Sequence, residues 1–131
     1  MSGIASSNPY GTLIGRILLA SLFIPAGFSK LTALSGTAGY FASKGLPAPM
    51  VVAVLVGLLE LVGGLAVLVG FKTRIAAILL GLFTIAAAFV AHMDFADQGQ
   101  LINFQKNLAI AGGFFVLAAV GAGALSVDAR K

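Results

Sequence analysis

A single glutamate, Glu60, stands in the middle of an apolar stretch that runs from Pro49 to Phe71. A lone carboxylate inside a bilayer costs roughly 3 kcal/mol or more, so such a side chain is usually paired, protonated or part of a functional site. In a functional role Glu60 would carry a proton or hydrogen-bond the headgroup of a quinone. In a structural role it would form an ion pair or, when protonated, a hydrogen bond between helices.

Glycines surround Glu60 at helical spacing. Gly57 lies three residues before it, and Gly63 and Gly64 lie three and four residues after it. Residues at these spacings share one face of a helix, and small residues allow another backbone or a flat ligand to approach closely. We therefore expect Glu60 to face a crowded helix interface rather than lipid.

Arg16 is the natural partner for Glu60, because it lies inside the first apolar stretch. It is about 8 Å inside the start of that stretch, and Glu60 is about 16 Å from the same face of the membrane. The remaining gap of about 8 Å is within reach of a long arginine angled along a helix bundle. Alternatively, Arg16 extends to the headgroups of the near face. Both arrangements remain open.

A second group of polar residues gathers at the opposite face. Lys30 ends the first apolar stretch, His92 and Asp94 end the third, and Lys106 and Asn107 begin the fourth. Histidine is the side chain best suited to proton exchange near neutral pH. Asn107 at a helix start could cap that helix or orient a polar ligand. The structural alternative is an interfacial histidine paired with Asp94.

Metal binding is not expected from this pattern. His92, Asp94 and Asp97 match many loops, whereas dedicated metal sites usually gather three or four well-placed ligands. The chain has no cysteine, which excludes thiolate ligands and dithiol chemistry. No motif for an intrinsic cofactor is evident. The cofactor considered is a quinone, whose headgroup Glu60 could hydrogen-bond.

The composition is that of an integral membrane protein. Of 131 residues, 60% are hydrophobic and 9% are charged, and the mean hydropathy is +1.08. Soluble domains carry about 25% charged residues. The chain is long enough for one domain, residues 1–131. The net charge of +4 forms no basic run, so nucleic-acid binding is not supported and the lipid bilayer is the expected partner.

Four stretches are long and apolar enough to span a bilayer, which takes about 20 residues. They are Gly11–Ser29, Pro49–Phe71, Ile75–His92 and Asn107–Leu125. The short connections between them predict an all-α, up-down-up-down bundle of four transmembrane helices. The longest connection, Lys30–Ala48, is expected to hold a short interfacial helix around Ala38–Ser43.

The distribution of basic residues predicts the orientation of the bundle. Five lie toward one face and three toward the other: Arg16, Lys72, Arg74, Arg130 and Lys131 against Lys30, Lys44 and Lys106. Cytoplasmic loops carry the excess of Lys and Arg. Both termini are therefore expected in the cytoplasm.

Short motifs along nearly the whole chain carry a family resemblance. They include Gly15-Arg16-Ile17-Leu18, Leu46-Pro47, Glu60-Leu61-Val62-Gly63-Gly64, Lys106-Asn107-Leu108-Ala109 and Ser126-Val127-Asp128. In this order and spacing they resemble the DoxX family of small four-helix membrane proteins. The resemblance implies a bacterial cytoplasmic (inner) membrane protein whose polar signature positions are Arg16, Lys30, Glu60, His92 and Asn107.

The resemblance implies less about the reaction. The family takes its name from membrane subunits of a thiosulfate–quinone or quinol-oxidising system, and most members have no established activity. We expect a quinone-linked redox accessory subunit, in which Glu60 and His92 act catalytically. The residues expected to bind the ligand are Arg16, Lys30, Asp94, Lys106 and Asn107.

Two other function classes fit the same sequence. One is a non-catalytic membrane adaptor or assembly protein that holds a redox or stress-response partner at the bilayer. The other is a small transporter with a proton-coupled carboxylate, which would need to be a homo-oligomer because four helices are few for alternating access. Three observations distinguish these hypotheses. Co-purified quinone would support the redox subunit, a captured protein partner would support the adaptor, and a homo-oligomer would be needed for the transporter.

Overall fold

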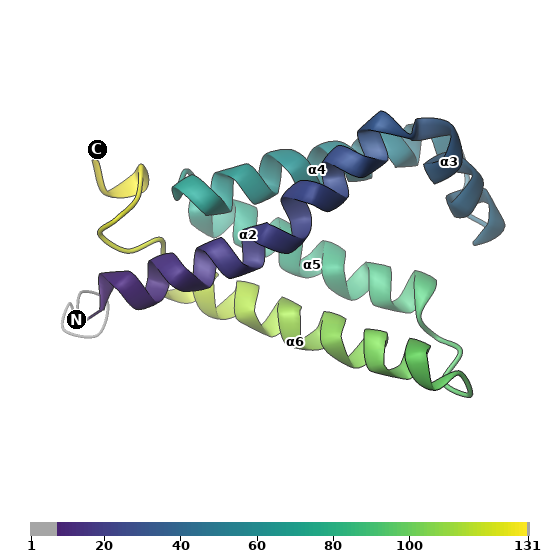
Figure 1. Cartoon of the computed structure of the whole chain (residues 1–131). Helices are drawn as coiled ribbons and strands as arrows, with labels where there is room; N and C mark the ends of the chain where they lie inside the picture. The colour runs from purple at the N-terminus through teal and green to yellow at the C-terminus, as the bar shows by residue number, and fades with distance from the viewer. Residues whose placement is uncertain (1–7, 131) are drawn as a thin grey trace.

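The computed structural model describes residues 8–130. Within this range the chain is helical, without strands, and Figure 1 shows how the helices are arranged. The elements are α2 (Pro9–Thr32), α3 (Leu34–Ser43), α4 (Pro49–Val69), α5 (Thr73–Ala91), α6 (Gln98–Val120) and a short 3₁₀ helix, η1 (Asp128–Arg130). The helices α2, α4, α5 and α6 are each long and apolar enough to cross a membrane. The expected all-α protein with four spans is confirmed.

The ends of α6 differ most from the sequence prediction. The helix was expected over Asn107–Leu125, but it begins at Gln98 and ends at Val120. It begins early because the side chain of Asp97 accepts hydrogen bonds from the backbone N–H groups of Gly99 and Gln100, which caps a polar first turn that hydropathy does not reveal. It ends early because Gly121 leaves the helical conformation with φ 84°. Asn107 is therefore not a cap but lies about 13 Å inside the helix.

The short helix expected around Ala38–Ser43 is α3, which begins four residues earlier, at Leu34. A single residue, Ala33, separates it from α2, with φ −136° and ψ 55°. Its buried side chains, Ala38 and Phe41, pack with Ala53 near the start of α4. The chain thus turns sharply at the end of α2 and returns along α4.

The helices form two antiparallel pairs, α2 with α4 and α5 with α6. The pairs meet in one core, in which Phe23 of α2 packs edge to face on Phe114 of α6 with ring centroids 5.3 Å apart. From this contact α2 and α6 diverge toward the end of the bundle that carries α3 (Figure 1). The start of α2 and η1 lie together at the opposite end.

The pairing of α2 with α4 depends on glycines, as expected from the sequence. A methyl group added at Gly27 of α2 would lie 2.7 Å from the carbonyl oxygen of Gly57 and would overlap the backbone nitrogen of Leu61. A methyl group at Gly64 would lie 2.9 Å from a side-chain carbon of Ile24. Close backbone contact of this kind is typical of helix pairs in membranes. It sets the relative height of α2 and α4, and hence which side chains meet.

The segment after α6 folds back and packs against the end of α4 and the start of α5. The backbone N–H groups of Val127 and Asp128 donate to the carbonyl oxygens of Val69, at 3.0 Å, and Gly70, at 2.8 Å. The Asp128 carboxylate accepts from the N–H groups of Lys72, at 2.7 Å, and Thr73, at 2.9 Å. These are unpaired donors at the start of α5. Asp128 therefore caps α5 from the far end of the sequence.

Candidate functional site

Glu60 is buried, with 5% of its surface exposed, and its partner is Lys30. Lys30 Nζ lies 2.8 Å from Glu60 Oε1, which is ion-pair distance, although Oε1 has no hydrogen bond of good geometry. The two groups nevertheless form an ion pair, because a flexible lysine side chain rotates easily into better alignment. The expectation that Glu60 faces a helix interface is confirmed. The alternative in which Arg16 pairs with Glu60 is wrong.

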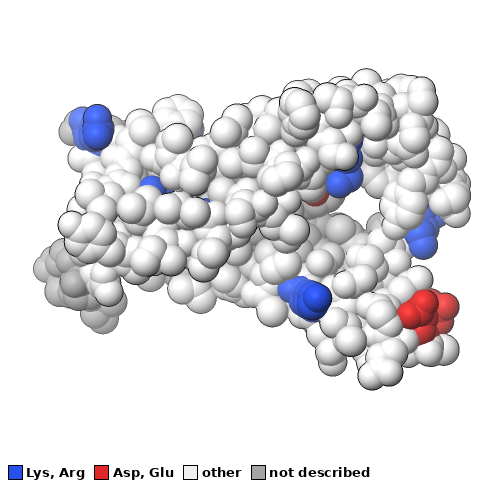
Figure 2. All heavy atoms as spheres, in the orientation of Figure 1, with Lys and Arg blue, Asp and Glu red and all other residues white. Residues whose placement is uncertain are grey.

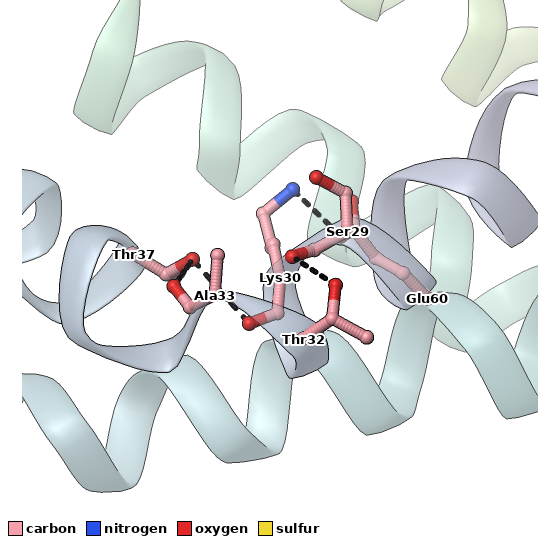
Figure 3. A network of polar contacts seen from close by, with 6 residues as sticks. All are labelled: Ser29, Lys30, Thr32, Ala33, Thr37 and Glu60. Carbon is pink, nitrogen blue, oxygen red and sulfur yellow. Dashed lines mark hydrogen bonds and ion pairs between the residues drawn. The ribbon is translucent and has the colours of Figure 1, made fainter.

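Hydroxyl groups at the end of α2 hold Lys30 in place (Figure 3). Thr32 Oγ1 donates to the carbonyl oxygens of Phe28, at 2.9 Å, and Ser29, at 3.2 Å. Thr37 Oγ1, in α3, lies 2.9 Å from the carbonyl oxygen of Ala33 and 3.4 Å from that of Lys30. The carbonyl oxygens of Lys30 and Ala33 also accept from the backbone N–H groups of Ala33, at 3.3 Å, and Thr37, at 3.0 Å, so the hydroxyl groups add a second contact to each. They fix the turn into α3 and direct Lys30 toward α4.

Arg16 instead binds the ends of two other helices. Its guanidinium group donates to the carbonyl oxygens of Ala122 (2.7 Å), Leu125 (2.9 Å) and Leu68 (3.2 Å). Leu68 is in the last turn of α4 and Ala122 follows α6, so the negative ends of both helix dipoles point at the cation. Only 1% of Arg16 is exposed, so it does not extend to the headgroups either. Arg16 therefore lies at the ends of α4 and α6 and not beside Glu60.

The Lys30–Glu60 pair lies in a hollow of about 400 Å³ between the two helix pairs. In Figure 2 the hollow is visible at the end that carries α3, with basic and acidic atoms inside it. Its polar side chains are Lys30, Glu60, Tyr40, Thr84 and Asn107, and its walls are otherwise apolar. Few polar groups in an apolar pocket of this size are typical of small-molecule sites.

Asn107 reaches the hollow from the facing helix pair. Its Nδ2 atom lies 3.4 Å from the carbonyl oxygen of Thr84 in α5, a long hydrogen bond that orients the amide. Hydrogen-bond donors therefore stand on two walls of the hollow, Lys30 from α2 and Asn107 from α6. The two were expected at one face of the membrane, and the structure instead places both on the walls of the hollow that holds Glu60.

The other residues expected at the outer face do not line this hollow. His92 follows the last helical residue of α5 and is partly exposed. Asp94 is exposed, with its backbone N–H donating to Gln100 Oε1 at 3.2 Å, and Lys106 is exposed on α6. Of the residues predicted at the outer face, Lys30 and Asn107 thus line the hollow, whereas the others lie outside it. Among residues 8–130 no group of three His, Asp or Glu side chains is placed to hold a metal ion.

Several residues of the hollow were not expected from the sequence, among them Thr84, Tyr40 and Phe41. Thr84 is buried and donates its hydroxyl to the carbonyl oxygen of Leu80 at 2.6 Å, and Tyr40 and Phe41 of α3 form part of the wall. A hydroxyl residue in the middle of an apolar stretch was the available signal for Thr84. The two aromatic residues carried no such signal, because their position depends on the turn at Ala33.

Removing Lys30 should lower the free energy of unfolding by the contribution of the Lys30–Glu60 ion pair. Breaking a buried ion pair costs about 3–5 kcal/mol, and we expect Lys30→Met to fall near the lower end, because 28% of the lysine side chain is exposed. The double change with Glu60→Leu should recover much of the loss, since no buried charge is then left alone. Free energies of unfolding in bicelles measure both. Additive losses from the two changes would show that the residues do not interact.

Comparison with known proteins agrees with this architecture. The family model described as DoxX matches residues 11–93, which include Arg16, Lys30, Glu60 and His92. The chain belongs to the DoxX family. No solved structure matches it.

Relatives of this DoxX protein cover nearly its full length. Inner membrane protein YqjF of Escherichia coli K12 is 46% identical over 118 residues, which cover 90% of this chain and 89% of the relative. Inner membrane protein YphA of the same organism is 37% identical over 130 residues, 95% and 93% of the two chains. "Putative oxidoreductase CatD" of Bacillus subtilis 168 is 32% identical over 112 residues, 81% and 82%. With its four spans, this DoxX protein is a multi-pass inner membrane protein.

Proposed function

We propose that this DoxX protein is a quinone-linked redox accessory subunit that holds a quinone headgroup in the hollow beside Lys30 and Glu60. The observation that carries the proposal is an ion pair within an otherwise apolar hollow of about 400 Å³. Ionisable residues inside membrane spans are costly and typically functional. An apolar hollow with a few polar groups suits a ring that is apolar on its faces and polar at its two carbonyl oxygens.

The hydrogen-bond donors on two walls of the hollow fit the two carbonyl oxygens of a quinone ring. Lys30 would donate to one quinone carbonyl, and the Asn107 amide, on the facing helix pair, would donate to the other. Reduction to the quinol takes two electrons and two protons. Glu60, beside Lys30, would pass the two protons in turn, and His92, which follows the lining residue Ala91, would exchange them with water near the rim. The electrons would come from a redox partner protein or directly from a reducing substrate.

The relative CatD gives limited support, since its printed name describes an oxidoreductase. With the termini in the cytoplasm, as the basic residues predict, the open end of the hollow would face the outer side of the membrane. A partner that delivers electrons would then act at the end of the bundle that carries α3.

The test is a quinone inventory of the mildly extracted protein, by solvent extraction and mass spectrometry. We expect stoichiometric quinone in the wild type and its loss in Glu60→Gln. Asp94→Asn is the matched control, because Asp94 is an exposed carboxylate outside the hollow, and it should retain the quinone. Absence of quinone from the wild type, together with no effect of added quinone on its thermal stability, would contradict the proposal and favour the adaptor hypothesis.

A further inference from the structure

The hollow is open to the side as well as toward the end of the bundle (Figure 2). We propose that this opening, between α2 and the α5–α6 pair, is a lateral entrance from the bilayer, and that the apolar tail of the bound ligand remains in it. The site would then take quinones with an isoprenoid or alkyl tail and exclude water-soluble, tail-less ones. The proposal rests on the proposed function for the headgroup, whereas the route can be tested separately.

The entrance follows from the angle between the helices. The side chain of Leu19 lies against Gly113, and Phe23 packs on Phe114, so α2 and α6 touch in the half of the bundle that carries η1. Beyond Phe23 they diverge (Figure 1), and the next turns of α2 line the hollow through Ala26 and Lys30. The wedge between the diverging helices forms the side opening.

The residues of the opening are apolar and mostly small. Leu22 and Ala26 contribute from α2, and Ala86, Ala87 and Val90 contribute from α5. Leu22 is 49% exposed and Val90 is 42% exposed, so the walls continue to the protein surface. Water gains few hydrogen bonds in such a space, whereas a hydrocarbon chain fills it without losing polar contacts.

The polar groups fix the direction in which the ligand lies. The Glu60 side chain is 7% exposed and the Lys30 side chain is 28% exposed, so the carboxylate is the enclosed member of the pair. A headgroup that hydrogen-bonds to this pair places its tail toward Leu22 and Val90, and from there into lipid. The ligand therefore need not pass through water to reach its site.

A tryptophan probe tests what enters the opening, since the chain has no tryptophan of its own. Phe83, which is partly buried, lines the hollow, and Phe83→Trp would report on its contents. In vesicles of phospholipid brominated along its chains, we expect strong quenching of this tryptophan and little quenching by aqueous iodide. Phe28→Trp, at a 60% exposed position, and Phe114→Trp, at an enclosed one, give the upper and lower references. Quenching by iodide but not by brominated chains would overturn the proposal.

Binding by tailed and tail-less quinones tests the tail itself. In nanodiscs, at equal total concentration, quenching of the Phe83→Trp protein should show a decyl-tailed benzoquinone binding about tenfold or more tightly than the tail-less ring, because the tail concentrates the ligand in the lipid beside the opening. Adding Ala87→Phe, which fills the opening, should weaken binding to a similar extent. Ala109→Phe is the matched control, because Ala109 is exposed on α6 outside the hollow, and it should have no effect.

The outcomes separate this proposal from the proposed function. Equal binding of both quinones, or unchanged binding in the Ala87→Phe variant, would overturn the lateral entrance. If no quinone binds but brominated chains still quench the probe, the entrance stands and the quinone-linked function fails.

Discussion

Replacing Arg16 by methionine is expected to lower the free energy of unfolding by about 3 kcal/mol or more, because it leaves three backbone carbonyl oxygens without their donor. The guanidinium group donates to the carbonyl oxygens of Leu68, Ala122 and Leu125. Each buried carbonyl group left without a donor costs about 1–3 kcal/mol. Methionine fills the space but satisfies none of them. Unfolding by increasing sodium dodecyl sulfate in mixed micelles measures the loss.

Two further variants make this prediction specific. Arg16→Lys keeps the charge but not the planar fork that reaches several carbonyl groups at once, so we expect an intermediate loss. Arg130→Met removes an exposed arginine and should change the free energy of unfolding by about 0.5 kcal/mol or less. If Arg16→Met were as stable as Arg130→Met, the three hydrogen bonds would have no structural importance.

Adding one methyl group at Gly27 is expected to separate α2 from α4. The new carbon would lie 2.7 Å from the carbonyl oxygen of Gly57 and would overlap the backbone of Leu61. Backbone atoms cannot rotate away as a side chain can, so we expect Gly27→Ala to cost about 3 kcal/mol or more, at the upper end of overpacking effects. The same change should weaken the Lys30–Glu60 contact, because Lys30 follows one turn after Gly27 and Glu60 precedes Leu61.

Gly15 provides the control for this change on the same helix. No atom lies within 4 Å of a methyl group added at Gly15, and alanine is the better helix former by about 1 kcal/mol. We therefore expect Gly15→Ala to be neutral or stabilising in the same unfolding experiment. Equal effects at the two positions would mean that the close contact between α2 and α4 does not determine stability.

Much of the fold could be predicted because hydropathy and helix length report directly on membrane spans. The helix interface around Glu60 could also be predicted, since Gly57 and Gly64 follow helical spacing and in the structure meet α2. Both inferences depend only on residues close together in the sequence. The partner of Glu60 could not be found in this way.

The reason is the relative position of α2 and α4 along the direction that crosses the membrane. The sequence placed Lys30 at the outer end of its span and Arg16 nearer to Glu60, as though each span began at the membrane surface. In the structure Gly27 lies against Leu61, which brings Lys30 level with Glu60, and α3 continues the chain beyond that height. This register is set by contacts between helices, which the separate spans do not encode. Asn107 was misplaced for a related reason, because the first turns of α6 are polar.

The hydrogen bonds of Arg16 have a consequence for the order in which the protein is made. Arg16 belongs to α2, whereas Ala122 and Leu125 follow α6, about a hundred residues later in the sequence. While a ribosome is still producing α4 and α5, the arginine has not yet met these two carbonyl groups. The nascent α2 must therefore carry an uncompensated cation, which is held at the membrane interface or neutralised by lipid phosphate. Its final contacts wait until Ala122 and Leu125 have been made, so a chain that stops before them lacks two of the three acceptors of this arginine.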